Sequence, residues 1–128
     1  MNKRMLTASA FTLFAQAGLF KSDVPSLKPA EAVSTIEKSS GVLVVKFWAS
    51  WCGPCKKMNP IFKKLAQNGN HQYYSLNADQ ADQACKKYKI TSLPTVSIFK
   101  DGEHLGNIVG VMSESDLSQK IEKFLSKN

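Results

Sequence analysis

The sequence predicts an α/β domain with a central mixed β-sheet and helices on both faces of the sheet. Residues 42–48 form an almost unbroken apolar run, as expected of a central strand that is covered on both sides. Strand-like and helix-like segments alternate after this run, which indicates parallel crossovers. Asp101-Gly102 marks a hairpin turn and adds antiparallel strands. The 128 residues suit one domain with a single core.

The first half of the domain is expected to contain a helix, the central strand and a second helix. Pro25 allows only a short edge strand before them. Pro29 then opens a helix that we expect to end at Ser40. After the strand over 42–48, apolar residues recur at helical spacing and predict a helix over 56–68.

The second half is expected to return to the sheet and to end in a helix. We expect a strand over 73–78 and a helix over 79–89. Two antiparallel strands follow, over 95–100 and 104–111. Ser113 is a good N-cap for the last helix, because its hydroxyl can accept a backbone N–H of the first turn.

The chain is basic, with a formal net charge of +7. Its lysines are scattered and form no block of like charges, which is typical of a solvated surface. Nucleic-acid binding would need clustered basic residues and a recognition motif. We therefore expect no nucleic-acid partner, and we expect a monomer.

The first residues have the three parts of a secretory signal. Lys3 and Arg4 give a basic start, a moderately apolar stretch follows, and Ala15-Gln16-Ala17 offers a signal-peptidase site. The apolar stretch is too short for a membrane span of about twenty residues. We expect a signal or N-terminal extension over 1–21, cleaved after Ala17, and a mature domain over 22–128. The protein is then extracytoplasmic, periplasmic or secreted; an amphipathic N-terminal helix on a cytoplasmic protein is the alternative.

The chemistry is concentrated in the segment Trp51-Cys52-Gly53-Pro54-Cys55-Lys56, where two cysteines stand between strand and helix. A sulfur at a helix N-terminus is stabilised as the thiolate, and its pKa falls from about 8.5 to roughly 3.5–7.5. Cys52 is expected at the exposed end of the helix, as the attacking thiol. Cys55 lies about one turn on and can resolve a mixed disulfide. Pro54 suits the first helical turn, and Gly53 leaves space for a substrate.

A zinc site is the main alternative for a Cys-x-x-Cys pair. Structural zinc requires four ligands at characteristic spacing, whereas Cys85, His71 and His104 are scattered. We therefore predict redox chemistry and no metal. Cys85 is expected to be a small, partly buried residue, with a regulatory thiol as the alternative.

Residues 47–56 resemble the active-site segment of the thioredoxin family, and the resemblance extends over roughly residues 23–126. Pro60 matches the proline within the family's active-site helix, and residues 91–95 match its cis-proline loop. The resemblance implies a thioredoxin-like fold. It also implies that Leu93 and Pro94 offer backbone to an extended substrate chain, and that Trp51 covers the thiols.

The chain departs from the family at two positions beneath the cysteines. Lys46 stands where the family has a buried Asp, and Ser75 where a lysine often accompanies that Asp. We expect the Lys46 side chain under the active-site helix, near Cys55. A charged Lys46 would stabilise thiolates and raise the reduction potential; alternatively, its side chain extends to solvent and affects the cysteines little.

The function expected from the residues and the resemblance is reduction of disulfides in protein substrates through Cys52 and Cys55. No metal or organic cofactor is needed, but an upstream reductase or a membrane electron donor must reduce the pair again. Two alternatives remain: an extracytoplasmic oxidant or isomerase of protein disulfides, and a non-catalytic binding module.

Overall fold

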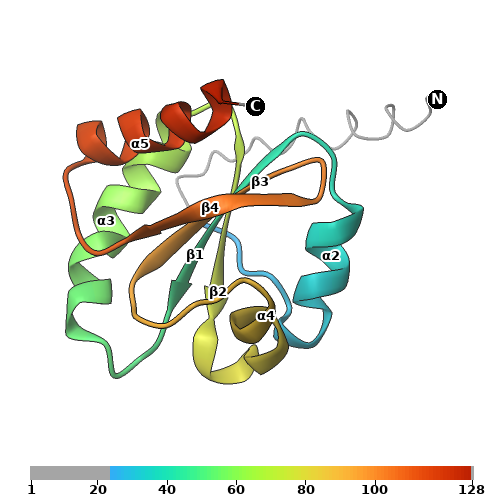
Figure 1. Cartoon of the computed structure of the whole chain (residues 1–128). Coiled ribbons are helices and arrows are strands. Elements are labelled where there is room, and N and C mark those ends of the chain that lie inside the picture. The colour runs from blue at the N-terminus through green and yellow to red at the C-terminus, as the bar shows by residue number, and fades with distance from the viewer. Residues whose placement is uncertain (1–23, 128) are drawn as a thin grey trace.

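The computed structural model describes residues 24–127 and shows a four-stranded mixed sheet with the strand order β2-β1-β3-β4 (Figure 1). The strands are β1 (Val42–Trp48), β2 (Gln72–Asn77), β3 (Thr95–Lys100) and β4 (Glu103–Val109). The β1 strand pairs in parallel with β2 and antiparallel with β3, and β3 pairs antiparallel with β4. The signal expected over 1–21 and its cleavage after Ala17 lie outside the described residues.

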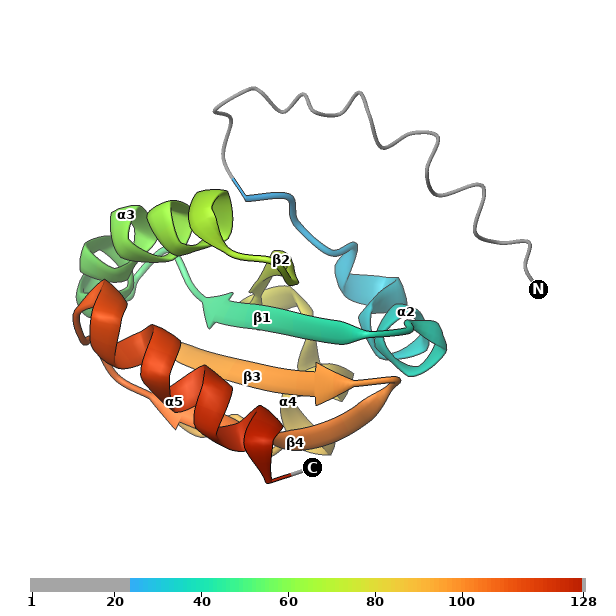
Figure 2. The same cartoon turned by 90° about the horizontal axis from the view of Figure 1, so that it is seen from above.

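Helices cover both faces of the sheet, as predicted. They are η1 (Pro29–Glu31), α2 (Ala32–Lys38), α3 (Gly53–Asn68), η2 (Ala78–Gln80), α4 (Asp82–Lys87) and α5 (Glu114–Ser126). The α2 and α4 helices lie on one face, whereas α3 and α5 lie together on the other (Figures 1 and 2). Within the described residues, no helix has the length and apolar character needed to cross a membrane.

Alternation along β1 divides the apolar side chains between two cores. One core lies between the sheet and α2 and α4, and it contains Leu43, Val45 and Phe47 of β1. The other lies under α3 and α5, and it contains Val44 of β1. Burying one such large side chain contributes roughly 1.5–3 kcal/mol. Because Lys46 continues the alternation of Val44, it belongs to the face that α3 covers.

Two predicted helices are shorter than expected. The helix predicted over 79–89 is interrupted at Ala81, whose φ of −126° and ψ of 55° are not helical, and is split into η2 and α4. The helix predicted from Pro29 to Ser40 begins as a 3₁₀ turn. It ends at Lys38, where the Ser39 hydroxyl donates to the carbonyl of Ile36 at 2.7 Å.

The hairpin between β3 and β4 forms as predicted at Asp101-Gly102. Both residues have positive φ, 51° and 83°, which matches the twist of a two-residue hairpin. An added Cβ at Gly102 would lie 2.6 Å from the carbonyl oxygen of Glu37, so the turn also packs against the end of α2. The β4 strand ends at Val109, before the predicted residue 111, and is followed by Gly110 with a φ of 101°.

The edges of the sheet agree in outline with the sequence. The short edge strand expected near Pro25 is a single parallel bridge between Ser26 and Ser75 of β2. At the other end of the chain, Ser113 caps α5 by accepting the backbone N–H of Asp116 at 3.1 Å.

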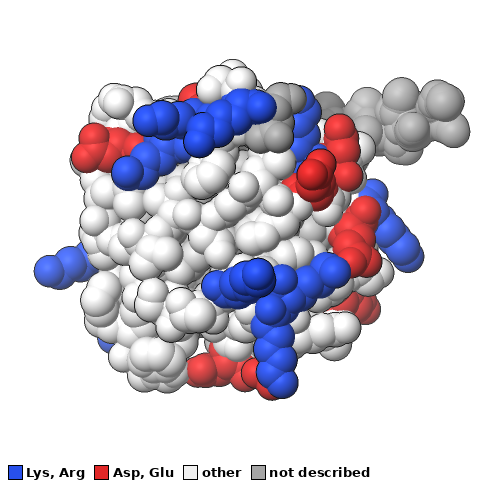
Figure 3. Space-filling view, in the orientation of Figure 1, with Lys and Arg blue, Asp and Glu red and all other residues white. Residues whose placement is uncertain are grey.

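Figure 3 shows that the lysines on the viewed face lie in separate groups with uncharged surface between them.

Candidate active site

Cys52 and Cys55 lie where β1 passes into α3. Cys52 is the N-cap of α3, and its Sγ accepts the backbone N–H of Cys55 at 3.1 Å. The two sulfurs form a disulfide across a Cα–Cα distance of 5.3 Å. The helix begins at Gly53, directly after Cys52, and Pro54 falls in its first turn, as expected; the helical spacing of the apolar residues had indicated only the part from Lys56 onward. This position at a helix N-terminus favours a thiolate on Cys52 after reduction.

The expectation that Cys52 is exposed is wrong. Cys52 and Cys55 are 3% and 2% exposed, so accessibility does not distinguish them. Both pack in a small cluster with Ala49, bordered by Trp48 and Leu93. A substrate must therefore reach the edge of a disulfide that is largely covered. The two cysteines differ in their position on α3 rather than in their exposure.

The cis-proline loop expected from the resemblance is present beside the disulfide. The Leu93–Pro94 peptide bond is cis, and Leu93 packs against the cysteine cluster. The backbone N–H of Gly110 donates to the carbonyl of Pro94 at 3.0 Å and ties this loop to the end of β4. On either side of Gly110, Val109 and Val111 are 57% and 41% exposed. Sequence reasoning did not find these two valines, although an apolar pair around a glycine is an unusual way to end an edge strand.

Trp51 precedes the disulfide and is 70% exposed, yet its ring is anchored. Its indole N–H donates to both carboxylate oxygens of Asp79, at 3.1 and 2.9 Å. Asp79 lies in η2, directly after β2. Sequence reasoning missed this partner, but a signal exists: β1 and β2 are parallel, so the residues that follow them meet at the same edge of the sheet.

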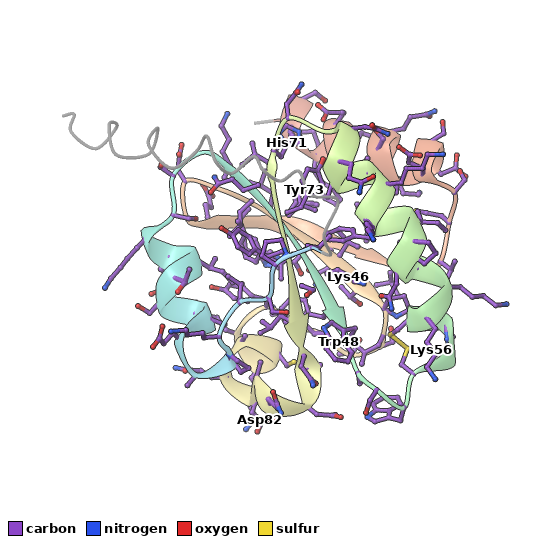
Figure 4. All side chains as sticks on the ribbon, turned by 180° about the vertical axis from the view of Figure 1, so that it is seen from behind. Lys46, Trp48, Lys56, His71, Tyr73 and Asp82 are labelled. Atoms are coloured by element: carbon purple, nitrogen blue, oxygen red, sulfur yellow. A yellow bond between two sulfur atoms is a disulfide. The ribbon has the colours of Figure 1, made fainter. Side chains whose placement is uncertain are left out.

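Lys46 and Ser75 are neighbours in the register of β1 and β2, as the resemblance implied. Lys46 is 5% exposed and lies on β1, beside α3 (Figure 4). Its ammonium donates to Oδ1 of Asn59 in α3 and lies 5.4 Å from the ring centroid of Phe62. Lys46 and Asn59 line a cavity of about 410 Å³ that Ser75 also borders. Asn59 is a further residue that sequence reasoning did not single out.

The other candidate ligands of a metal do not gather at the cysteines. His71 contacts Glu122 at 2.9 Å, and His104 contacts Asn107 at 2.9 Å. Within residues 24–127, no group of three or more His, Cys, Asp and Glu side chains could hold a metal ion. Cys85 is partly buried, as expected. Burial, with smaller contributions from Asp82 and Asp79, raises the pKa of its thiol.

A cysteine pair at a helix N-terminus, a cis-proline loop beside it and a mixed sheet covered on both faces together define the class of disulfide oxidoreductases with a thioredoxin-like fold. The comparison with known families agrees with this class. The chain belongs to the thioredoxin family, because the Thioredoxin family model matches residues 23–123.

Individual relatives support the assignment. Thioredoxin M4, chloroplastic, of Arabidopsis thaliana is 38% identical over 105 residues, which cover 80% of this chain and 54% of the relative. A thioredoxin of Staphylococcus saprophyticus is 40% identical over 88 residues, 67% of this chain and 85% of the relative. The chain spans about half the length of the chloroplastic relatives it matches. The reduced thioredoxin pre-protein of Schistosoma mansoni matches with a TM-score of 0.70 and 33% identity, over 80% of this chain and 99% of that one.

Proposed function

We propose that this protein exchanges disulfides with protein substrates and acts mainly as a reductant. The observation that carries the proposal is the Cys52–Cys55 disulfide at the N-terminus of α3, next to the cis-proline loop. No metal or organic cofactor takes part, because the two sulfurs carry both electrons.

The exchange proceeds in two displacements. In the reduced protein, the Cys52 thiolate attacks one sulfur of a substrate disulfide, and the other substrate sulfur leaves as a thiolate that takes a proton from water. Cys55 then gives its proton to water and attacks Sγ of Cys52, which releases the second substrate sulfur as a thiolate that takes up a proton in turn. Two electrons pass to the substrate, and Cys52 and Cys55 end as the disulfide seen in the structure.

The surface around the disulfide suits an extended protein chain. Leu93 and Pro94 belong to the loop beside the disulfide, and Trp51, held by Asp79, directly precedes Cys52. Val109 and Val111 supply further exposed apolar area next to the loop. Binding through main-chain hydrogen bonds and small apolar contacts gives broad rather than sequence-specific recognition. The substrates are therefore proteins with accessible disulfides.

Reduction in a cycle requires a donor of electrons. For the extracytoplasmic form, with a signal over 1–21, the donor is a membrane electron carrier; for a cytoplasmic form, it is a soluble reductase. We place the mature domain over 22–128 outside the cytoplasm, on the basis of Ala15-Gln16-Ala17 and the apolar stretch before it. An oxidant or isomerase is the second candidate, because the direction of exchange depends on the reduction potential. Lys46, which is buried beneath the helix that carries the cysteines, would favour a higher reduction potential and therefore this second candidate.

The test compares two serine variants in the reduction of insulin by dithiothreitol. Cys52→Ser abolishes turnover, because no thiol remains at the N-cap. With pre-reduced Cys55→Ser and no dithiothreitol, the first attack is retained and mixed disulfides between Cys52 and the substrate accumulate, detected by mass spectrometry of the intact complex. A wild-type protein without reductase activity would favour the binding module. Mixed disulfides that form on Cys55 in Cys52→Ser, and none on Cys52 in Cys55→Ser, would reverse the assigned roles.

A further inference from the structure

Lys46 is an ionisable side chain inside the protein. The buried polar side chains of residues 24–127 are otherwise those of Ser75, Thr95 and Ser97, all neutral. The position is dictated by β1: alternation places Lys46 on the side of α3, between the sheet and the helix that carries the cysteines. A buried charge is costly unless the surrounding groups stabilise it.

Two groups that contact the ammonium lie on α3. Asn59 accepts its hydrogen bond, and the face of the Phe62 ring lies 5.4 Å away. An amide oxygen and an aromatic face both favour the charged form of lysine. Lys63, also on α3, lines the same cavity and adds a second positive charge near its wall.

The contacts of Lys46 continue the helix stripe of Cys55. Asn59 is four residues after Cys55 and therefore lies on the same face of α3, one turn on. Phe62 lies a further turn along that stripe. The positive charge is thus held below the face of the helix that carries the resolving cysteine. A field that passes through a protein interior is weakened much less than one in water.

We propose that Lys46 positions a positive charge that stabilises the reduced, thiolate-bearing pair more than the disulfide, and that Asn59 holds it there. The inference rests on the proposed disulfide exchange and specifies its direction. Lys46 raises the reduction potential and makes the protein a weaker reductant, because the reduced pair carries negative charge and the disulfide carries none. Lys46 forms and breaks no bond in the exchange. Its charge changes the relative stability of the reduced and oxidised forms of the cysteine pair.

The test uses two variants that alter the charge in different ways. Lys46→Met removes the charge and keeps most of the side-chain volume. Asn59→Asp keeps the lysine and places a carboxylate beside it, on a residue at the surface of α3. Lys64→Met is the matched control, since it removes one positive charge from an exposed position of the same helix.

The measurement is the equilibrium between the protein dithiol and oxidised glutathione, together with the pH dependence of Cys52 alkylation. Lys46→Met lowers the ratio of reduced to oxidised protein at fixed glutathione about tenfold, which corresponds to about 30 mV for a two-electron couple. In the same variant, the midpoint of the pH profile of Cys52 alkylation moves to higher pH. Asn59→Asp shifts both readouts in the same direction, and Lys64→Met leaves the equilibrium within about twofold of the wild type.

A merely structural role for Lys46 predicts a different result. Loss of packing would lower the free energy of unfolding equally in the oxidised and reduced forms, and the equilibrium with glutathione would not move. A change below about twofold in both variants overturns the inference. Failure of the proposed function appears elsewhere, as a wild-type pair that reaches equilibrium with glutathione but does not reduce protein disulfides. If Lys46→Met does not fold, Asn59→Asp decides the question.

Discussion

The indole N–H of Trp51 is bonded to both carboxylate oxygens of Asp79, although the tryptophan side chain is 70% exposed. Two loops are joined by this contact. One follows β1 and leads to Cys52 at the start of α3, and the other follows β2 and leads into η2. The contact keeps a large apolar ring beside the disulfide, where an unanchored side chain would sample several rotamers.

We predict that Asp79→Ala lowers kcat/KM for insulin reduction about threefold to tenfold. The reason is the loss of a hydrogen bond to a charged group, which leaves Trp51 free to turn away from the substrate. The free energy of unfolding changes by less than about 0.5 kcal/mol, because Asp79 is exposed. Asp82→Ala, at an exposed position in α4, is the control. If Asp79→Ala and Asp82→Ala had the same kcat/KM, the hydrogen bond between Trp51 and Asp79 would have no part in the reaction.

Cys85 is predicted to be a slow thiol. Burial raises its pKa, so the thiolate fraction near pH 7 is smaller than in an exposed cysteine. In a Cys52→Ser/Cys55→Ser background, iodoacetamide labels Cys85 slowly at pH 7, and the labelling rate rises at higher pH than that of an exposed cysteine. Cys85→Ala leaves insulin reduction nearly unchanged. Rapid labelling at neutral pH, or a large loss of activity, would give this thiol a part in the reaction.

Gly102→Ala is predicted to destabilise the fold by about 2 kcal/mol or more. The φ of 83° is unfavourable for alanine, and the added Cβ would lie 2.6 Å from the backbone oxygen of Glu37, which cannot easily move. Gly53→Ala is the control, because nothing lies within 4 Å of its added Cβ. Urea unfolding of both variants measures the difference. Similar losses in both would mean that α2 adjusts to the new methyl group.

The proposed signal predicts a mature chain that starts at Gly18 in the protein purified from its native host. Cleavage follows Ala17 because small residues at 15 and 17 fit a signal peptidase. Intact-mass measurement gives the answer directly. A mass equal to that of the whole chain, with or without Met1, would return the protein to the cytoplasm.

Strands were easier to predict from this sequence than helices. The bounds of β1 and β3 agree with prediction, because a continuous apolar run and an Asp-Gly turn are both local signals. The break at Ala81 could not be seen, since Ala favours helix and its backbone is set by the surrounding fold. The cysteines were identified from their spacing alone, whereas their low exposure depends on Leu93, about forty residues away in the sequence.

The direction of the Lys46 side chain also lay beyond the sequence. Alternation along β1 places it on the side of α3, but a flexible side chain of four carbons can end near the cysteines or at the rim of the cavity. The structure shows the Lys46 ammonium hydrogen-bonded to Asn59, one turn beyond Cys55. This position lies between the two alternatives, the cysteines and the rim of the cavity. Local sequence patterns therefore predicted which residues form the site. The contacts between these residues join segments that are far apart in the chain, so local patterns could not predict them.

The cysteines follow β1, and the cis-proline loop precedes β3, so both halves of the site are attached to antiparallel neighbours paired at Phe47 and Thr95. The exposed connection near Asn70 lies between these halves in the sequence. A chain divided there would carry the disulfide on one fragment and Pro94 on the other. Reductase activity in a mixture of the two fragments would then report that the sheet had reassembled, and the protein could serve as a sensor of association between any two partners fused to its halves.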